Sequence, residues 1–133
     1  FDVLDMPYLF VDKSHHSRIL NGEIGKELLD GLRQYNMYGL SFYSCGFRNI
    51  YANKPVTSPA DLRGMKIRVM ESPVMIESLN KMGASATSLS ASEVFTALKT
   101  GVVDGAENNP NVFVSGGHIE AVKYYSLTRH FTS

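Results

Sequence analysis

Short apolar segments alternate with segments of helical periodicity along most of this chain, and this alternation constrains the fold more than any other feature. Residues 47–52, 65–70 and 84–89 have the length and composition of short strands. Between and after them, apolar side chains recur at helical spacing. Because buried parallel strands are covered by helices on both faces, the pattern predicts an α/β fold with a mostly parallel sheet flanked by helices.

Capping signals mark the starts of three predicted helices. Ser58-Pro59 and Ser72-Pro73 each place a side-chain acceptor directly before a proline, whose fixed φ suits the first helical position. Ser90 and Glu93 have the spacing of a capping box. These signals set the predicted boundaries between the strands and the helices that follow them.

The first third of the chain predicts two helices and then a strand. Asp12 or Ser14 is expected to cap a short helix that reaches Leu20, and a second helix is expected over residues 24–35. Residues 37–43 alternate and are rich in β-forming side chains, so we predict a strand there. A last strand is expected over residues 121–127.

The composition excludes several classes of protein. Thirteen acidic residues balance thirteen basic ones and no basic run stands out, so we expect no nucleic-acid partner. Cys45 is the only cysteine, which rules out an intramolecular disulfide. No uninterrupted apolar run approaches the ~20 residues that a membrane-spanning helix needs.

Signals for a metal, a cofactor or catalysis are weak. No cysteine or carboxylate stands at metal-ligand spacing around His15 and His16, so we expect no metal site. Residues 115–118 lack the spacing of a phosphate-binding glycine loop, and we expect no cofactor. A Gly-x-Ser-x-Gly nucleophile elbow is absent. A small α/β hydrolase or transferase that uses a serine or histidine stays open as the alternative function.

Arg68 is the most informative single residue. It lies among apolar neighbours in a predicted interior strand, where an unpaired charge costs several kcal/mol. Its planar guanidinium suits a carboxylate in bidentate geometry. From the sequence, this partner is either the carboxylate of a ligand or a structural partner such as Glu71, Asp104 or Glu107.

Arg68 and Asn108 each lie at or near the carboxyl end of a predicted strand, where α/β sheets bind ligands. Arg48 follows Gly46-Phe47 and, taken alone, is expected to be a surface arginine. Asn108 and Asn109 precede Pro110, and a side-chain amide there is expected to cap the next helix.

Three stretches, together and in this order, resemble the substrate-binding subunits of TRAP transporters, the DctP-type family. They are GFRN at 46–49, DLRGMKIRV at 61–69 and SEVFTALKTGVVDGAEN at 92–108, with FDVLDMPYLF at 1–10 in support. Each motif alone is weak, but their combination and spacing are specific, and the resemblance runs through the whole chain. Members of this family are secreted, two-lobed α/β proteins that close around a ligand and bind no cofactor.

The resemblance implies roles for five residues. Arg68 corresponds to the arginine that clamps the ligand carboxylate, Arg48 to a second arginine that assists it, and Asn108 to an asparagine that contacts the ligand. Glu71 and Ser72 fall in a segment that lines the pocket. The family's usual aromatic residue before the Ser-Glu-Val segment is replaced here by Ala91, which leaves the size of the ligand open.

The resemblance also implies a place for this chain in a larger protein. Complete members are more than twice as long, so residues 1–45 are expected to be a remnant of the first lobe that ends in a hinge strand. Residues 46–133 are expected to form the contiguous part of the second, ligand-clamping lobe.

The implied function is that of a periplasmic, non-enzymatic protein that captures a C4-dicarboxylate or a sugar acid for the ion-gradient-driven membrane subunits of a TRAP transporter. A fragment without independent binding is the other alternative, and we expect its exposed apolar faces to favour self-association.

Overall fold

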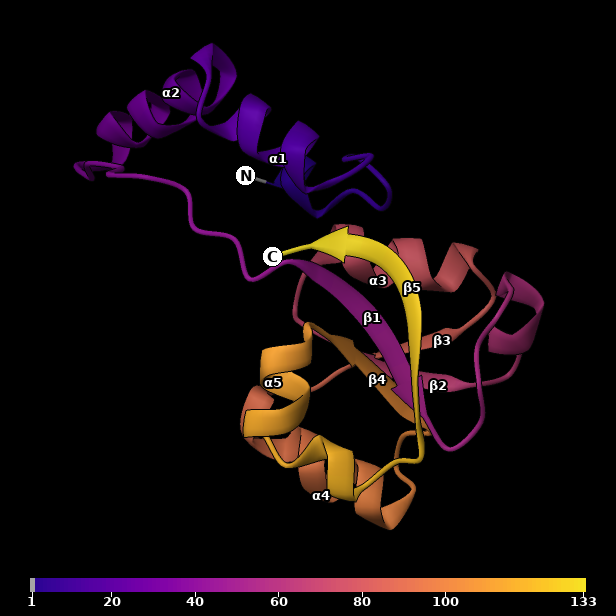
Figure 1. The fold of residues 1–133 in the computed structure, drawn as a ribbon. Helices are drawn as coiled ribbons and strands as arrows, with labels where there is room; N and C mark the ends of the chain where they lie inside the picture. Colours follow the sequence, from indigo (N-terminus) through magenta and orange to yellow (C-terminus); the bar gives the residue numbers. More distant parts are fainter. Residues whose placement is uncertain (1) are drawn as a thin grey trace.

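The computed structural model describes residues 2–133 and divides into an N-terminal arm and a body. The arm comprises residues 2–46 and extends away from the body, which comprises residues 47–133 (Figure 1). Within the described residues, no helix is long and apolar enough to cross a membrane. The assignment of residues 1–45 and 46–133 to two lobes of a larger protein stays a prediction.

The arm is helical, as predicted. After a 3-10 helix at Asp2–Asp5 come α1 (Lys13–Leu20) and α2 (Glu23–Asp30), the latter continued by a 3-10 helix at Gly31–Tyr35. The Asp12 carboxylate caps α1 by accepting a hydrogen bond from the His15 amide at 2.7 Å. The helical path of the arm ends at Asn36, which has a left-handed conformation (φ 57°).

The strand predicted over residues 37–43 is wrong. This segment is extended, but it pairs with no strand among residues 2–133. Strand-forming side chains select an extended backbone, whereas a ladder also needs a neighbouring strand to exchange hydrogen bonds with. Apolar side chains are left in solvent as a result, with Leu40 94% and Tyr43 85% exposed.

The body is built on a five-stranded sheet in the order β3-β2-β4-β1-β5. Its strands are β1 (Phe47–Ala52), β2 (Lys66–Val69), β3 (Ser85–Ser88), β4 (Gly105–Asn108) and β5 (Tyr124–Thr132). Strand β2 runs parallel to β3 and β4, and β1 runs antiparallel to both β4 and β5. Four strands therefore share one direction and β1 alone is reversed.

The α/β class is confirmed, but the sheet is mixed, with two parallel and two antiparallel pairings. The reversal of β1 has a physical cause in the connection that follows it. Between β1 and β2 the chain forms only a 3-10 helix at Pro59–Leu62. Because it lacks a crossover helix that returns the chain to the starting edge, β2 begins where β1 ends and runs the other way.

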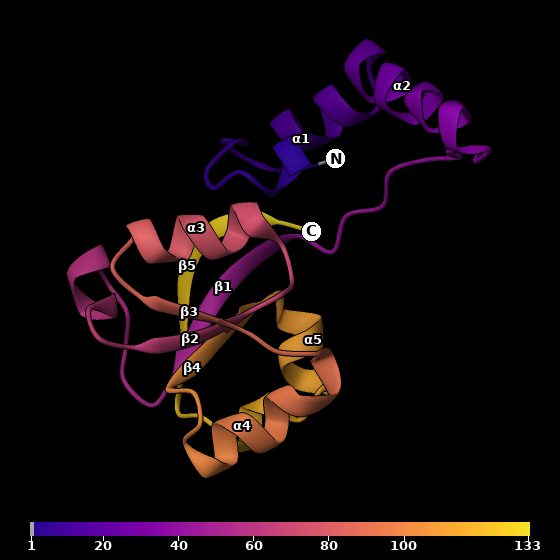
Figure 2. The same cartoon turned by 180° about the vertical axis from the view of Figure 1, so that it is seen from behind.

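Helices cover both faces of the sheet (Figures 1 and 2). Helix α3 (Pro73–Lys81) packs on the face that carries Ile50, Ile67 and Val69. Helices α4 (Val94–Thr100) and α5 (Pro110–Ser115) pack on the opposite face. Since successive strand residues point to opposite faces, each strand contributes side chains to both cores.

The predicted capping signals are confirmed. The Ser72 hydroxyl accepts a hydrogen bond from the Met75 amide at 3.4 Å at the start of α3. Backbone amides of Ser58 and Ser90 donate to Asp61 at 2.8 Å and to Glu93 at 3.1 Å, respectively. These exchanges satisfy amide groups that the first helical turn leaves without partners.

Hydrogen bonds hold the arm to the body. The Tyr8 amide donates to the His130 carbonyl at 2.9 Å, and the Cys45 amide donates to the Ser133 carbonyl at 2.6 Å. The arm therefore contacts the C-terminal end of β5.

Candidate functional site

The candidate site lies at one edge of the sheet. Strands β2, β4 and β5 end at this edge and β1 begins there, because β1 alone runs in the opposite direction. The edge brings together Arg48 near the start of β1, Arg68 in the second half of β2 and Asn108 at the end of β4. Three residues distant in sequence thus lie at the edge where an α/β sheet is expected to bind ligands.

The two arginines lie on opposite faces of the sheet. Arg68 alternates with the α3-facing residues Ile67 and Val69 and therefore points to the face covered by α4 and α5. Asn108 points to that same face, since it lies two residues after Ala106, the register partner of Arg68. Arg48, by alternation with Ile50, belongs to the α3 side.

Arg68 is buried but has no anionic partner. It is 4% exposed, and its Nε and Nη2 donate to the backbone carbonyl of Leu89 at 2.9 and 2.6 Å. No carboxylate among residues 2–133 forms an ion pair with it. Burial lowers the pKa of Arg68, while the more distant charge of Glu107 acts against this shift. The guanidinium therefore keeps Nη1 and a full positive charge available.

The structural partners considered for Arg68 are engaged elsewhere or free. Asp104 accepts a hydrogen bond from the Lys66 amide at 2.7 Å. Glu107 binds Arg48, and Glu71 is exposed in the turn between β2 and α3, with no side-chain partner among residues 2–133. The structural salt bridge to Arg68 is therefore excluded for all three.

The expectation of a surface location for Arg48 taken alone is wrong. Arg48 is buried, and its Nε and Nη2 each donate to a carboxylate oxygen of Glu107 at 2.6 Å. Burial by itself lowers the pKa of Arg48, but the hydrogen bonds and charge of Glu107 outweigh it and raise the pKa. Burial raises the pKa of Glu107, and the guanidinium of Arg48 opposes that shift. The sequence did not reveal this pair because its members are 59 residues apart.

His130 completes a buried group on the α3 side. Its Nδ1 lies 2.8 Å from the Thr128 hydroxyl, which itself accepts from the Ile50 amide at 3.1 Å. The Thr128 hydrogen is thus free to donate to Nδ1, which leaves the proton of the neutral ring on Nε2, 3.8 Å from Glu107. Burial, with a contribution from Arg48, lowers the pKa of His130 to about 3, so the imidazole is neutral near pH 7.

Asn108 and Asn109 divide two roles between them. The Asn109 side chain caps α5 by accepting from the Val112 amide at 3.0 Å. The side-chain oxygen of Asn108 accepts from the Asn109 amide at 2.9 Å, and its Nδ2 has no partner among residues 2–133. Asn108 therefore presents hydrogen-bond donors, not acceptors, at the edge of the sheet.

The other positions singled out in the sequence, Glu71, Ser72 and Ala91, differ in their contacts and exposure. The Ser72 hydroxyl, besides capping α3, donates to Asp5 of the arm at 2.8 Å. Ala91 is exposed and lies two residues after Leu89, the carbonyl partner of Arg68. Glu71 and Ala91 are therefore open to solvent, whereas Ser72 links the arm to the body.

The sequence did not single out Asn49 and Tyr125, which lie next to Asn108 in the structure. Asn49 is the register partner of Asn108, and the Tyr125 hydroxyl donates to the Asn108 carbonyl at 3.0 Å. The available signal was an asparagine inside an otherwise apolar strand, in the same GFRN motif as Arg48.

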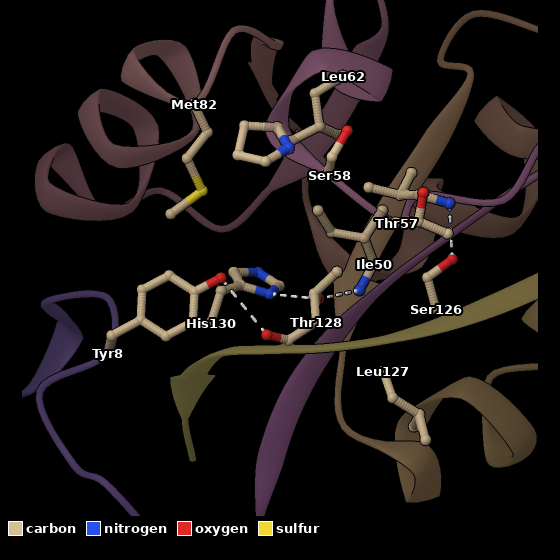
Figure 3. A pocket seen from close by; sticks show the side chains of 12 residues that line it. Tyr8, Ile50, Thr57, Ser58, Leu62, Met82, Ser126, Leu127, Thr128 and His130 are labelled. Carbon is tan, nitrogen blue, oxygen red and sulfur yellow. Dashed lines mark hydrogen bonds between the residues drawn. The ribbon is translucent and has the colours of Figure 1, made fainter.

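A separate cavity of about 510 Å³ lies on the α3 side, between Tyr8 of the arm, the segment 56–62 and β5 (Figure 3). Apolar groups such as Ile50, Leu62 and Met82 dominate its wall, together with hydroxyls and His130. It has no lysine or arginine in its lining. The cavity therefore offers no cation to a carboxylate and is distinct from the edge with Arg68.

At one place, the side chains that the hydrolase alternative requires lie close to one another, but their chemistry does not suit catalysis. Thr128, His130 and Glu107 lie in a hydroxyl–imidazole–carboxylate order, as a nucleophilic site requires. However, His130 is fully buried with a pKa of about 3, which makes its imidazole a poor general base at neutral pH. No cluster of three or more potential metal ligands occurs among residues 2–133.

Comparison with known proteins places this geometry in context. The model of the DctP family, described as bacterial extracellular solute-binding protein, family 7, matches residues 1–133. A solute-binding protein of Chromohalobacter salexigens is 42% identical over 130 residues, covering 97% of this chain and 39% of the relative. The C4-dicarboxylate-binding periplasmic protein DctP of Rhodobacter capsulatus is 38% identical, covering 98% of this chain and 39% of the relative.

Among solved structures, a TRAP periplasmic solute-binding protein of Citrobacter koseri with bound D-glucuronate is similar, with a TM-score of 0.93 and 42% identity. The match covers 98% of this chain and 44% of that structure. The chain thus spans about two fifths of the length of the curated relatives that it matches.

Proposed function

The chain belongs to family 7 of the bacterial extracellular solute-binding proteins, and on that basis we propose that it supplies the carboxylate-binding half of a periplasmic solute-binding protein. The complete protein would capture a small organic acid and deliver it to the membrane subunits of a TRAP transporter, driven by an ion gradient. Here "full-length form" means a protein of the relatives' length that contains residues 1–133.

The observation that carries the proposal is the unpaired charge of Arg68. A buried guanidinium whose only partner among residues 2–133 is a neutral carbonyl is destabilising unless an anion completes the site. A ligand carboxylate at Nη1 would supply that anion through charge-assisted hydrogen bonds. Arg68 is therefore the proposed carboxylate clamp.

Asn108 and Arg48 have supporting roles in this proposal. The free Nδ2 of Asn108 would donate to a hydroxyl or carboxylate oxygen of the ligand. Two nitrogens of Arg48 donate to Glu107, the residue before Asn108. Arg48 would therefore contribute to ligand binding mainly by fixing the end of β4. Its Nη1 has no partner among residues 2–133 and would remain for the ligand.

The proposed ligand is a sugar acid or a C4-dicarboxylate. The relative from Rhodobacter capsulatus is named for C4-dicarboxylates, and the structure from Citrobacter koseri contains D-glucuronate. Both ligands present a carboxylate that suits Arg68. Glu71, which is exposed beside this edge, is proposed to line the pocket. Ser72 is proposed to line the pocket next to Glu71, held in place by its hydrogen bond to Asp5.

No catalysis is proposed. The neutral, buried state of His130 disfavours the hydrolase alternative, and the family match favours a binding protein. The arm and the body are proposed to belong to two lobes that close around the ligand, which would strengthen the contacts of Arg68 by excluding water.

Isothermal titration calorimetry of the full-length form with D-glucuronate and with succinate tests the proposal. We expect one of these acids to bind, and Arg68→Ala to weaken its affinity by about 10- to 100-fold, as loss of charge-assisted hydrogen bonds predicts. Arg63→Ala, at an exposed arginine of the same body, is the control and should bind as the unsubstituted protein does. Unchanged affinity of Arg68→Ala would refute the proposed clamp.

A further inference from the structure

Asn49 is the centre of a buried hydrogen-bond network beside the candidate site. It is 2% exposed, and its Nδ2 donates to the Phe47 carbonyl at 3.0 Å and to the Tyr125 hydroxyl at 3.1 Å. Its Oδ1 accepts from the Arg129 amide at 2.9 Å. Both hydrogens of the amide and its oxygen are thus used, and one side chain connects the start of β1 to β5.

The network reaches the candidate site through Tyr125. The Tyr125 hydroxyl accepts from Asn49 and donates to the backbone carbonyl of Asn108 at 3.0 Å. Every hydrogen in this relay therefore points from Asn49 toward Asn108. The result is a directed path from the buried Asn49 to Asn108, the residue that presents the donor.

Ring packing fixes the position of the Tyr125 hydroxyl. The ring stacks on Tyr51, with centroids 5.9 Å apart and planes inclined by 10°, and it contacts Phe113 at 4.7 Å. Phe113 belongs to α5, the helix that Asn109 caps directly after Asn108. Tyr125 therefore holds both the carbonyl of Asn108 and the helix that follows it.

Asn108 needs such support because it is the last residue of β4. Its side-chain oxygen is turned inward onto the Asn109 amide, so the direction of Nδ2 depends on the backbone at this strand end. The register between β4 and β1 ends at the pair Asn108 and Asn49. A donor held loosely here would lose affinity, since productive contacts tolerate displacements of only about 0.5 Å.

The backbone conformation of Arg129 indicates that the hydrogen bond from its amide to Asn49 stabilises this part of β5. Arg129 has φ 47°, a left-handed conformation that costs a residue other than glycine on the order of 1 kcal/mol. Its amide is held in that conformation by Asn49. Between Arg48 and Ile50 the register of β5 also shifts, so Asn49 lies opposite an irregular stretch of β5.

We propose that Asn49 and Tyr125 are positioning residues, which act through the Asn108 backbone to direct the Asn108 amide at an acceptor oxygen of the ligand. This inference rests on the proposed function and extends it to two residues that need not touch the ligand themselves. It predicts that their effect on affinity depends on the presence of the Asn108 side chain.

A double-mutant cycle on the full-length form tests this dependence, with D-glucuronate or succinate as the probe, whichever binds more tightly. Tyr125→Phe removes the hydroxyl and keeps the ring, and it should weaken affinity about fivefold. In an Asn108→Ala background, the same change should alter affinity by less than about twofold. Tyr124→Phe is the matched control, because Tyr124 is 45% exposed and its side chain has no hydrogen bond among residues 2–133.

Asn49→Asp provides a second, independent variant. A carboxylate at this position accepts from the Tyr125 hydroxyl, so it reverses the relay and withdraws the hydrogen from the Asn108 carbonyl. We expect the same pattern, a loss of affinity that disappears in the Asn108→Ala background. Thermal denaturation of each variant separates lost stability from lost affinity.

Equal losses of affinity with and without the Asn108 side chain would mean that Tyr125 has only a structural role and would overturn the inference. So would an unchanged affinity of Tyr125→Phe when Arg68→Ala weakens binding as expected. Failure of the unsubstituted full-length form to bind either acid would overturn the proposed function itself, and this inference with it.

Discussion

The guanidinium of Arg48 and the carboxylate of Glu107 face each other in a bidentate ion pair, with both N–O distances at 2.6 Å. Both side chains are buried, and Nη2 of Arg48 also lies 3.3 Å from the Glu107 carbonyl. The pair therefore joins the start of β1 to the residue before Asn108. The contribution of this pair to stability can be measured separately from ligand binding.

Glu107→Gln should lower the free energy of unfolding by about 3 kcal/mol, because it leaves the Arg48 charge buried without a counter-ion. Urea denaturation of the full-length form measures the change. Glu77→Gln, which breaks the exposed pair with Lys81, is the control and should cost less than about 0.5 kcal/mol. Equal effects of the two changes would contradict the role assigned to the buried pair.

Stability should fall in acid because of His130. The folded pKa of His130 is about 3, below the unfolded value of 6.5, so its contribution is complete above pH 6.5 and is lost as the pH falls toward 3. Between pH 6.5 and pH 5 this loss amounts to roughly 2 kcal/mol.

The measurement is the difference in free energy of unfolding between pH 6.5 and pH 5. His130→Gln removes the titrating group and should reduce that difference, whereas His15→Gln, on the arm, should retain it. A His130→Gln protein with undiminished pH dependence would show that other groups cause the acid sensitivity.

Adjacent asparagines should separate binding from stability. Asn108→Ala removes the free donor and is expected to weaken ligand affinity about tenfold. Asn109→Ala removes the cap of α5 and is expected to cost about 1 kcal/mol of stability while leaving affinity within about twofold. Calorimetry and thermal denaturation of both variants distinguish the two effects, and a reversed pattern would contradict the division of roles.

The chain of residues 1–133 alone should self-associate or dissolve poorly at low salt. Leu40 and Tyr43 are 94% and 85% exposed on an extended segment with no strand partner among residues 2–133. Light scattering should detect oligomers, and the double change Leu40→Ser with Tyr43→Ser should reduce their mass. A monomer that melts cooperatively would refute this expectation.

Local chemistry explains which elements were predictable. The caps at Asp12, Ser72 and Asn109 act over three residues, so their signals are complete within a short stretch of sequence. The β-forming segment 37–43 misled because strand formation requires a partner that local composition does not reveal.

The candidate site was likewise predictable only where local sequence carried the signal. The resemblance predicted roles for Arg48, Arg68 and Asn108, but it did not reveal the contacts that decide what each can do. Asn49 and Tyr125 could not be predicted because their hydrogen bonds join distant segments, and Tyr125 lies 76 residues from Asn49.

The sequence by itself determined the α/β class, the helix starts and the family, and it pointed to the arginine proposed as the carboxylate clamp, because periodicity, capping and motif spacing are properties of neighbouring residues. Only the tertiary structure decided that β1 is reversed, that Glu107 neutralises Arg48 and that Arg68 has no carboxylate partner within the described part of the chain. The physical reason is that the two arginines compete for carboxylate partners. The sequence offers several such carboxylates, and the register of β1 against β4 determines which guanidinium forms an ion pair.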